Sequence, residues 1–219
     1  MKLLLVQKDI NNRNYRRFLD DAVDRSPDIV CFPELATSGC LYDGGRGVDF
    51  DQLLAILSGY DFSVCVGFPR NHEGRLYNSY MHVKDGEYQI YDKINLFPPM
   101  NEPDVYEPGT QPGIVETGFG RLGIAICYDL RFPELFQHLA KGGAEKILVP
   151  AAFPRVRIAD WTQLIAQRAR ETNAHVIGVN AVGDDGTNEF GGCTMVADPS
   201  GEVLHQADEV TEQVVEMEL

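Results

Sequence analysis

The chain has 219 residues, of which 44% are hydrophobic, and this is enough for one large core. We therefore expect a single domain over residues 1–219. The formal net charge of -14 argues against nucleic acid and anionic membranes as partners, because phosphate binding needs clustered Lys and Arg. The apolar runs are also shorter than the ~20 residues that a spanning helix needs.

The cysteines and histidines indicate the cellular compartment and whether a metal site is expected. The five cysteines are odd in number and form no CxxC pair, which favours a reducing, cytoplasmic compartment over a disulfide scaffold. The five histidines show no metal-ligand spacing, so we expect neither a metal site nor a cofactor. The first eight residues are typical of a first strand and are too short for a secretory signal.

Apolar patterning predicts an alternation of strands and helices along the chain. In the first half we expect strands over 2–7, 28–33 and 62–68, helices over 12–25 and around 53–57, a Gly-rich loop over 39–47, and a hairpin of 77–83 with 88–93. In the second half we expect a loop over 98–113, strands over 121–127, 145–150, 176–180, 190–197, 203–206 and 214–217, and helices after Cys127 and over 157–172. This pattern indicates an α/β protein with a mixed sheet or two sheets.

Cys127 is the most informative residue. It ends an apolar run, and the residues after it have helical spacing at Phe132, Leu135, Phe136 and Leu139. A cysteine at such a turn has helix N–H groups aimed at it, which favour a thiolate and stabilise an oxyanion beside it. The alternative is a small buried core residue.

Two other predicted strands end at charged residues. The apolar run that begins at Ile29 stops at the carboxylate of Glu34, and Lys93 ends the strand over 88–93. Strand ends are where an α/β sheet binds ligands, so we expect Glu34, Lys93 and Cys127 to meet there. A carboxylate, an ammonium and a thiol supply a base, an oxyanion partner and a nucleophile.

At these residues the chain resembles the nitrilase, or carbon–nitrogen hydrolase, superfamily. The matching motifs are FPEL at 32–35, DKINLF at 92–97 and CYDLRFPEL at 127–135, in the order that the family has them. The resemblance implies a four-layer α-β-β-α sandwich. It also implies a homodimer or a higher homo-oligomer that associates through the helical layers.

The resemblance also implies roles for individual residues. Glu34 would be the general base, Lys93 the oxyanion partner, Cys127 the nucleophile, and Glu102 the second carboxylate that orients the lysine. The backbone N–H of Tyr128 is the second oxyanion donor that we expect. Two departures from the family pattern, Asp92 before the lysine and Asn95 two residues after it, leave the pocket shape and the substrate open.

For the substrate-binding wall, we expect contributions from Phe153, Arg155 and Arg131. The strand over 145–150 leads to Phe153 and Arg155, and Arg155 is the candidate anchor for a substrate carboxylate. For Arg131 a structural pair with Glu134 is favoured over substrate contact. Trp161 is expected in the core, and Asn180, Phe190 and Cys193 are further wall candidates.

The function predicted from these motifs is hydrolysis of a small linear amide through a cysteine thioester, with release of ammonia. In having a tyrosine, Tyr128, directly after the cysteine, the motif resembles that of the omega-amidase-like branch, whose substrates carry a carboxylate. An N-carbamoyl amidohydrolase would use the same residues, and a nitrile substrate is less favoured. A catalytically silent scaffold of the same fold is the alternative from another class. A redox-sensor protein would need a resolving cysteine nearby.

Overall fold

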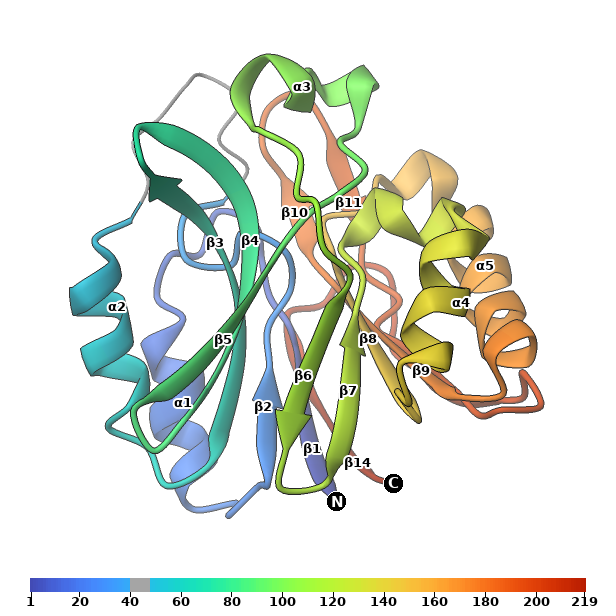
Figure 1. Cartoon of the computed structure of the whole chain (residues 1–219), viewed down its shortest axis with the longest axis horizontal. Coiled ribbons are helices and arrows are strands. Elements are labelled where there is room, and N and C mark those ends of the chain that lie inside the picture. Colours follow the sequence, from blue (N-terminus) through green and yellow to red (C-terminus); the bar gives the residue numbers. More distant parts are fainter. Residues whose placement is uncertain (40–47) are drawn as a thin grey trace.

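A computed structural model describes residues 1–39 and 48–219 of the chain. The Gly-rich loop predicted over 39–47 therefore lies, apart from Gly39, outside the described residues. Two six-stranded sheets face each other, and helices cover the outer face of each (Figure 1). This is the α-β-β-α layering that the resemblance implied.

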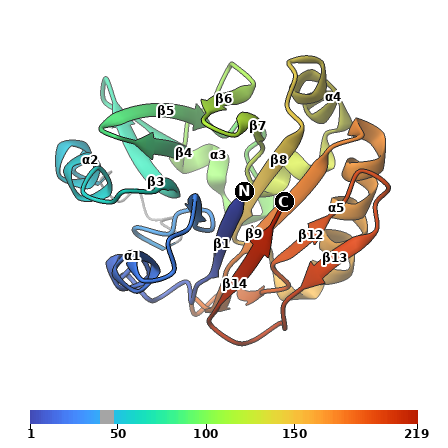
Figure 2. The ribbon, with the colours of Figure 1, turned by 90° about the horizontal axis from the view of Figure 1, so that it is seen from below.

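The first sheet has the strand order β14-β1-β2-β3-β4-β5. Three neighbouring strands, β1 to β3, are parallel, and the remaining pairs are antiparallel. The termini of the chain lie side by side, because the first and last strands pair (Figure 2). The bounds are β1 Lys2–Gln7, β2 Ile29–Cys31, β3 Ser63–His72, β4 Arg75–Lys84, β5 Glu87–Asp92 and β14 Gln213–Glu218.

The second sheet repeats this plan in the order β13-β12-β9-β8-β7-β6. Its strands β7, β8 and β9 are parallel, and its outer pairs are antiparallel. A separate two-stranded ribbon is formed by β10 Val182–Asp184 and β11 Glu189–Gly191. The bounds in the second sheet are β6 Gly113–Thr117, β7 Gly120–Ile124, β8 Lys146–Ala151, β9 His175–Asn180, β12 Met195–Ala197 and β13 Val203–Gln206.

Helices of the two outer layers bury one face each. The helices α1 Arg16–Val23 and α2 Phe50–Leu57 cover the first sheet, and α4 Pro133–Lys141 and α5 Ile158–Thr172 cover the second (Figures 1 and 2). Proline suits the first turn of α4, where its missing N–H would have no helical partner. The short helix α3 Glu102–Val105 lies at the top of Figure 1, above the ends of the strands.

The side chains of β1 show how the layers are held together. Leu3 and Leu5 belong to the core between the sheets, whereas Leu4 and Val6 pack in the core beneath α1 and α2. Successive side chains of a strand point to opposite faces, so a strand covered on both sides needs a continuous apolar run. The sequence Leu-Leu-Leu-Val meets this need.

Several predicted elements differ from the structure. The segment 98–113 is not all loop, because it contains a 3₁₀ turn, Pro98–Met100, and α3. The strand before Cys127 ends at Ile124, and the residues Cys127–Arg131 form a 3₁₀ turn ahead of α4. The single strand expected over 190–197 is split into β11 and β12, and β6 and β10 were not predicted. Within the described chain, every helix is too short or too polar to cross a membrane.

Candidate active site

The residues predicted to meet are carried by loops at one end of the sandwich. Glu34 lies three residues after β2, Lys93 directly after β5, and Cys127 three residues after β7. The loop that carries Glu34 passes so close to β3 that only glycine fits at position 67. A Cβ there would lie 2.4 Å from the Leu35 nitrogen. Gly67 thus allows the carboxylate to turn back over the sheet.

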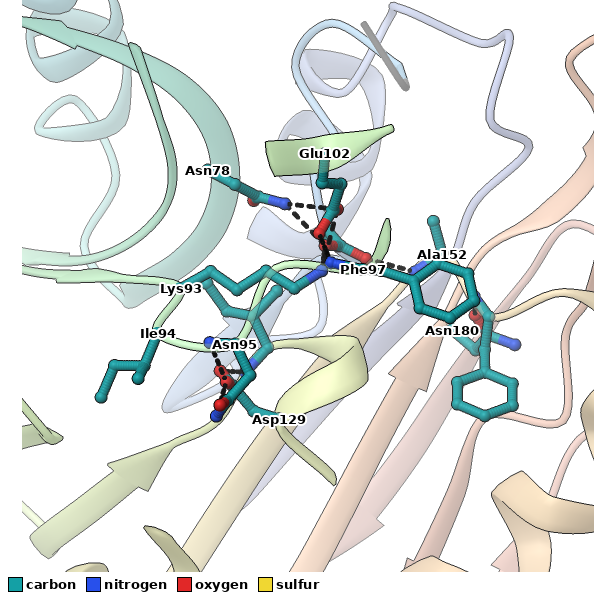
Figure 3. Close-up of polar contacts among 12 residues, drawn as sticks. Asn78, Lys93, Ile94, Asn95, Phe97, Glu102, Asp129, Ala152 and Asn180 are labelled. Atoms are coloured by element: carbon teal, nitrogen blue, oxygen red, sulfur yellow. Dashed lines mark hydrogen bonds and ion pairs between the residues drawn. The ribbon is translucent and has the colours of Figure 1, made fainter. Parts of the chain in front are cut away.

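Lys93 lies between two buried carboxylates. Its Nζ is 2.7 Å from Oε1 of Glu34 and 2.9 Å from Oε1 of Glu102. Lys93 and Glu102 point toward each other in Figure 3. The side chains of Lys93, Glu34 and Glu102 are at most 3% exposed. Because an ammonium has three donors, these two bonds leave a third N–H of Lys93 for another oxygen.

Asn78, in the middle of β4, also binds both carboxylates. Its Nδ2 donates to Oε1 of Glu34 at 2.7 Å and to Oε1 of Glu102 at 3.4 Å (Figure 3). Sequence reasoning missed this residue. Its only signal is an amide side chain in the buried part of a strand, and that pattern does not reveal its partners.

Backbone donors fix the outer oxygen of each carboxylate. The Ala152 N–H donates to Oε2 of Glu34 at 2.9 Å, and the Phe97 N–H donates to Oε2 of Glu102 at 2.7 Å. Ala152 follows β8 of the second sheet, whereas Glu34 follows β2 of the first. The Glu34 carboxylate therefore bridges the two sheets, and its orientation depends on both.

Cys127 is in contact with this cluster and is 6% exposed. Burial raises the pKa of the Cys127 thiol well above its usual range. The charges of Glu34 and Glu102 and a hydrogen bond to Glu34 act in the same direction, and Lys93 opposes them. The sequence favoured an ionised thiol, whereas in this site burial first, and then Glu34 and Glu102, act against ionisation, and Lys93 only partly offsets them.

The charge of the lysine is secured by the same two carboxylates. Burial alone would lower the pKa of Lys93, but the charges of Glu102 and Glu34 outweigh it and hold the pKa well above its usual range. Burial raises the pKa of Glu102, and Glu34 adds to this shift while Lys93 opposes it. The cluster thus favours a charged Lys93 beside a thiol whose ionisation is opposed.

The backbone of Cys127 has a left-handed conformation, with φ of 47°. Non-glycine residues adopt this region at a cost of order 1–2 kcal/mol, and it is held only where the surroundings enforce it. Here the enforcing group is Asp129, whose Oδ2 accepts the Ile126 N–H at 2.9 Å and the Tyr91 hydroxyl at 2.7 Å. Its Oδ1 accepts both the backbone and the side-chain N–H of Asn95.

These contacts account for the two departures from the family pattern. Asn95 ties the loop after Lys93 to Asp129, on the segment that carries Cys127 (Figure 3). Asp92 forms an ion pair with Arg70 at 2.6 Å and accepts a hydrogen bond from Ser79. Both residues therefore hold the lysine segment in place from outside the carboxylate cluster.

A small pocket opens beside Cys127. Its walls combine aromatic rings with two guanidinium groups, and they are formed by Phe97, Cys127, Tyr128, Arg131, Phe153, Pro154 and Arg157. Three sequence candidates, Tyr128, Phe153 and Arg131, therefore line the pocket. Arg131 forms its ion pair with Asp160 of α5, at 2.5 Å, and not the expected pair with Glu134.

The other wall candidates lie elsewhere. Arg155 forms ion pairs with Glu189 at 2.5 Å and Glu209 at 3.5 Å, and it is not among the residues that line the pocket. Trp161 is fully buried, as expected for a core residue, and its Nε1 donates to the Cys193 carbonyl. Asn180 accepts the Phe153 N–H and braces the loop behind the pocket. Phe190 is buried in a small cluster with Phe97.

Within residues 1–39 and 48–219, no group of three or more His, Cys, Asp or Glu side chains is arranged to hold a metal ion. The acidic side chains next to Cys127 are instead engaged by Lys93, Asn78 and backbone N–H groups.

Comparison with known proteins points to one family. The family model described as carbon-nitrogen hydrolase matches residues 6–219. An (R)-stereoselective amidase of Pseudomonas sp. is 35% identical over 88% of this chain and 73% of its own length. A 2-oxoglutaramate amidase of Bacillus subtilis is 33% identical over 90% of this chain and 80% of its own.

A solved structure agrees with this assignment. A CN-hydrolase superfamily protein of Xanthomonas campestris superposes with a TM-score of 0.88 at 27% identity, covering 99% of this chain and 89% of its own. The family model, the relatives and the shared architecture lead to the same conclusion. The chain belongs to the carbon–nitrogen hydrolase family.

Proposed function

We propose that the protein is an amidase that hydrolyses a small linear amide bearing a carboxylate, through a thioester on Cys127. The observation that carries the proposal is the position of Lys93. It lies between Glu34 and Glu102, and the Cys127 thiol, which hydrogen-bonds to Glu34, lines a small pocket beside them. A base, a fixed cation and a nucleophile at one point are what acyl transfer needs.

In the first half-reaction, Glu34 accepts the thiol proton while Sγ of Cys127 bonds to the amide carbonyl carbon. The proton moves within the cluster, so the step adds no net charge to a buried site. The new oxyanion is held by the third N–H of Lys93 and by the Tyr128 backbone N–H. The C–N bond then breaks as Glu34 returns the proton to nitrogen, and ammonia leaves.

In the second half-reaction, Glu34 takes a proton from water and the hydroxyl oxygen bonds to the thioester carbon. The C–S bond breaks as the proton passes to sulfur, which restores the neutral thiol. The net change is amide plus water to carboxylic acid plus ammonia. Glu102 keeps Lys93 in position through both steps, and the Phe97 N–H fixes Glu102.

The preference for a carboxylate-bearing amide rests on two supports. The pocket carries two arginines, Arg131 and Arg157, beside the nucleophile. The Bacillus subtilis relative is named for 2-oxoglutaramate, a short amide that carries a carboxylate. An N-carbamoyl amidohydrolase remains the second candidate, because the same cluster can attack a carbamoyl carbon.

The proposal is tested by measuring ammonia release from a panel of short amides and N-carbamoyl compounds. We expect turnover of the amides by the wild type, none by Cys127→Ala, and normal turnover by Cys193→Ala as the control cysteine. Cys127→Ala removes only the sulfur atom, so the variant should stay folded, with a melting temperature close to that of the wild type. An acyl adduct that mass spectrometry detects on the wild type and not on Cys127→Ala would locate the thioester.

Three outcomes separate the alternatives. Turnover that persists in Cys127→Ala contradicts the thioester mechanism. Release of carbon dioxide together with ammonia, from N-carbamoyl compounds only, assigns the carbamoylase activity instead. No hydrolysis of any compound, together with uniformly slow alkylation of all the cysteines, supports the silent scaffold.

A further inference from the structure

Three arginines lie near the pocket, and their charges are not equally available. Arg131 is 2.5 Å from Asp160. Arg155 is held by Glu189 and Glu209. Arg157 lines the pocket and forms no ion pair within 4.0 Å with any residue of the described chain.

The fold explains why Arg155 and Arg157 differ although they are two residues apart. Both belong to one 3₁₀ turn, Arg155–Arg157, which connects β8 to α5. Successive residues of such a turn are rotated by about 120°, so side chains two residues apart point in different directions. Arg155 points toward Glu189 of β11, and Arg157 points to the pocket. Val156 between them is 90% exposed.

An aromatic ring holds the Arg157 guanidinium at the pocket. Its Cζ lies 5.7 Å from the centroid of the Phe97 ring, within the range of a cation–π contact. Within the described chain the guanidinium makes no side-chain hydrogen bond or ion pair, so its N–H donors remain for a ligand. The Phe97 N–H also fixes Glu102, so the guanidinium is set at a defined place relative to the catalytic cluster.

The overall charge makes an uncompensated cation important. The chain carries a formal net charge of -14, and its field disfavours the approach of an anion. Lys93 is neutralised by two carboxylates and is committed to the oxyanion. An arginine with a free edge can bind a carboxylate through two parallel hydrogen bonds.

We infer that Arg157 binds the carboxylate of the substrate and sets the preference for acidic over neutral amides. This inference rests on the proposed amidase function. Arg157 replaces Arg155 as the candidate anchor for the substrate carboxylate, because the charge of Arg155 is already paired outside the pocket. Arg131 shares the wall, but its charge is cancelled by Asp160.

The experiment compares two amides of equal length, one ending in a carboxylate and the other in a hydroxymethyl group. We expect Arg157→Gln to lower kcat/KM for the acidic amide by ~10- to 100-fold, chiefly through KM, as for the loss of a charge-assisted hydrogen-bond pair. The neutral amide should change by less than ~3-fold. Arg157→Lys should recover part of the loss. Arg155→Gln is the matched control and should affect both amides alike.

The outcomes separate this inference from the proposed function. Equal losses for the two amides in Arg157→Gln overturn the inference, and so does a selective loss in Arg155→Gln or Arg131→Gln alone. If the wild type hydrolyses the neutral amide through Cys127 with no preference for the acidic one, the amidase stands and the inference fails. If it hydrolyses neither, the proposed function fails and the inference falls with it.

Discussion

At the scale of single residues, the site depends on how many donors serve its two carboxylates. Oε1 of Glu34 and Oε1 of Glu102 each accept from Lys93 and from Asn78. Two carboxylates this close repel each other, and the repulsion is relieved only by donors placed between them. Asn78 is therefore a positioning residue that acts through Glu34 and Glu102.

The change Asn78→Asp tests this role. It keeps the shape of the side chain, removes the donor and adds a third acid to the cluster, so one carboxyl group must hold a proton at neutral pH. We expect kcat to fall by ~10- to 100-fold, as for the loss of a hydrogen bond to a charged group, and the acidic limb of the pH profile to move to higher pH.

The neighbouring residue provides the control. Ser79 follows Asn78 on β4 but donates to Asp92, outside the cluster, so Ser79→Ala should leave the pH profile in place. A fall in activity for Asn78→Asp without any movement of the profile would indicate a general loss of structure instead. Rates measured from about pH 4 to about pH 8 follow the acidic limb, which is the one that the variant is expected to move.

At the scale of elements, the site depends on a tie between two loops. The Asp129 carboxylate accepts four hydrogen bonds: one from Tyr91 of β5, two from Asn95 in the loop after β5, and one from Ile126 in the segment that leads to Cys127. Asp129 is fully buried. Burial raises its pKa, and the hydrogen bonds, with that of Tyr91 first, and the charge of Lys93 oppose the shift. No side chain of the same shape can replace the Asp129 carboxylate, because the amide of asparagine cannot accept all four hydrogen bonds.

The change Asp129→Asn places an NH₂ group against at least one pair of donors, whichever way the amide turns. We expect the free energy of unfolding to fall by about 2 kcal/mol or more, since buried donors lose a charged acceptor. Activity should fall as well, because Cys127 loses the support of its strained backbone. Urea denaturation and ammonia release measure the two effects.

Tyr91→Phe is the graded control for this tie. It removes only one of the four donors, so we expect a loss of ~1 kcal/mol and most of the activity retained. If Asp129→Asn is as stable as the wild type, Asp129 does not hold the two loops together.

Whether the sequence could predict a site residue depends on where in its element that residue lies. Glu34, Lys93 and Cys127 could be predicted because each follows an apolar run, and an α/β sheet gathers strand ends. Asn78 could not be predicted, since it lies within a strand and register decides what it meets. Which of the two arginines, Arg155 or Arg157, faces the pocket depends on a short 3₁₀ turn, and the rotation of that turn leaves no periodic signal in the sequence.

The missed elements have similar causes. The strand β6 lies after a loop rich in proline and glycine, and its alternation is too short to stand out. The 3₁₀ turn at Cys127–Arg131 precedes a helix whose apolar spacing is the same whether the helix begins at the cysteine or at Pro133. Long periodic elements such as α5 were predicted within a residue or two of their ends.

At the scale of the whole molecule, buried titratable groups should make the free energy of unfolding decrease at alkaline pH. Five buried groups, Cys31, Tyr80, Tyr91, Lys93 and Cys127, have pKa values raised well above their usual range. For the two tyrosines and Cys127 the largest cause is burial, and for Cys31 it is a hydrogen bond with Cys65. For Lys93, burial acts the other way and the two glutamates outweigh it.

The sign of the pH effect follows from which state keeps its protons. Unfolded cysteine, tyrosine and lysine lose protons at about pH 8.5, 10 and 10.4, whereas the folded chain keeps them to higher pH. The unfolded state then binds fewer protons, so the free energy of unfolding decreases as pH rises. The stability is fully present below about pH 8, and we expect a loss of about 2–4 kcal/mol between about pH 8 and about pH 10.

Urea denaturation at several pH values measures this loss. The double variant Cys31→Val, Cys127→Ala should show a shallower decline, because its two thiols no longer titrate in the unfolded chain. A stability that is constant or rises over this range would contradict the neutral state of the buried thiols, and with it the role of Glu34 as the group that removes the proton from Cys127.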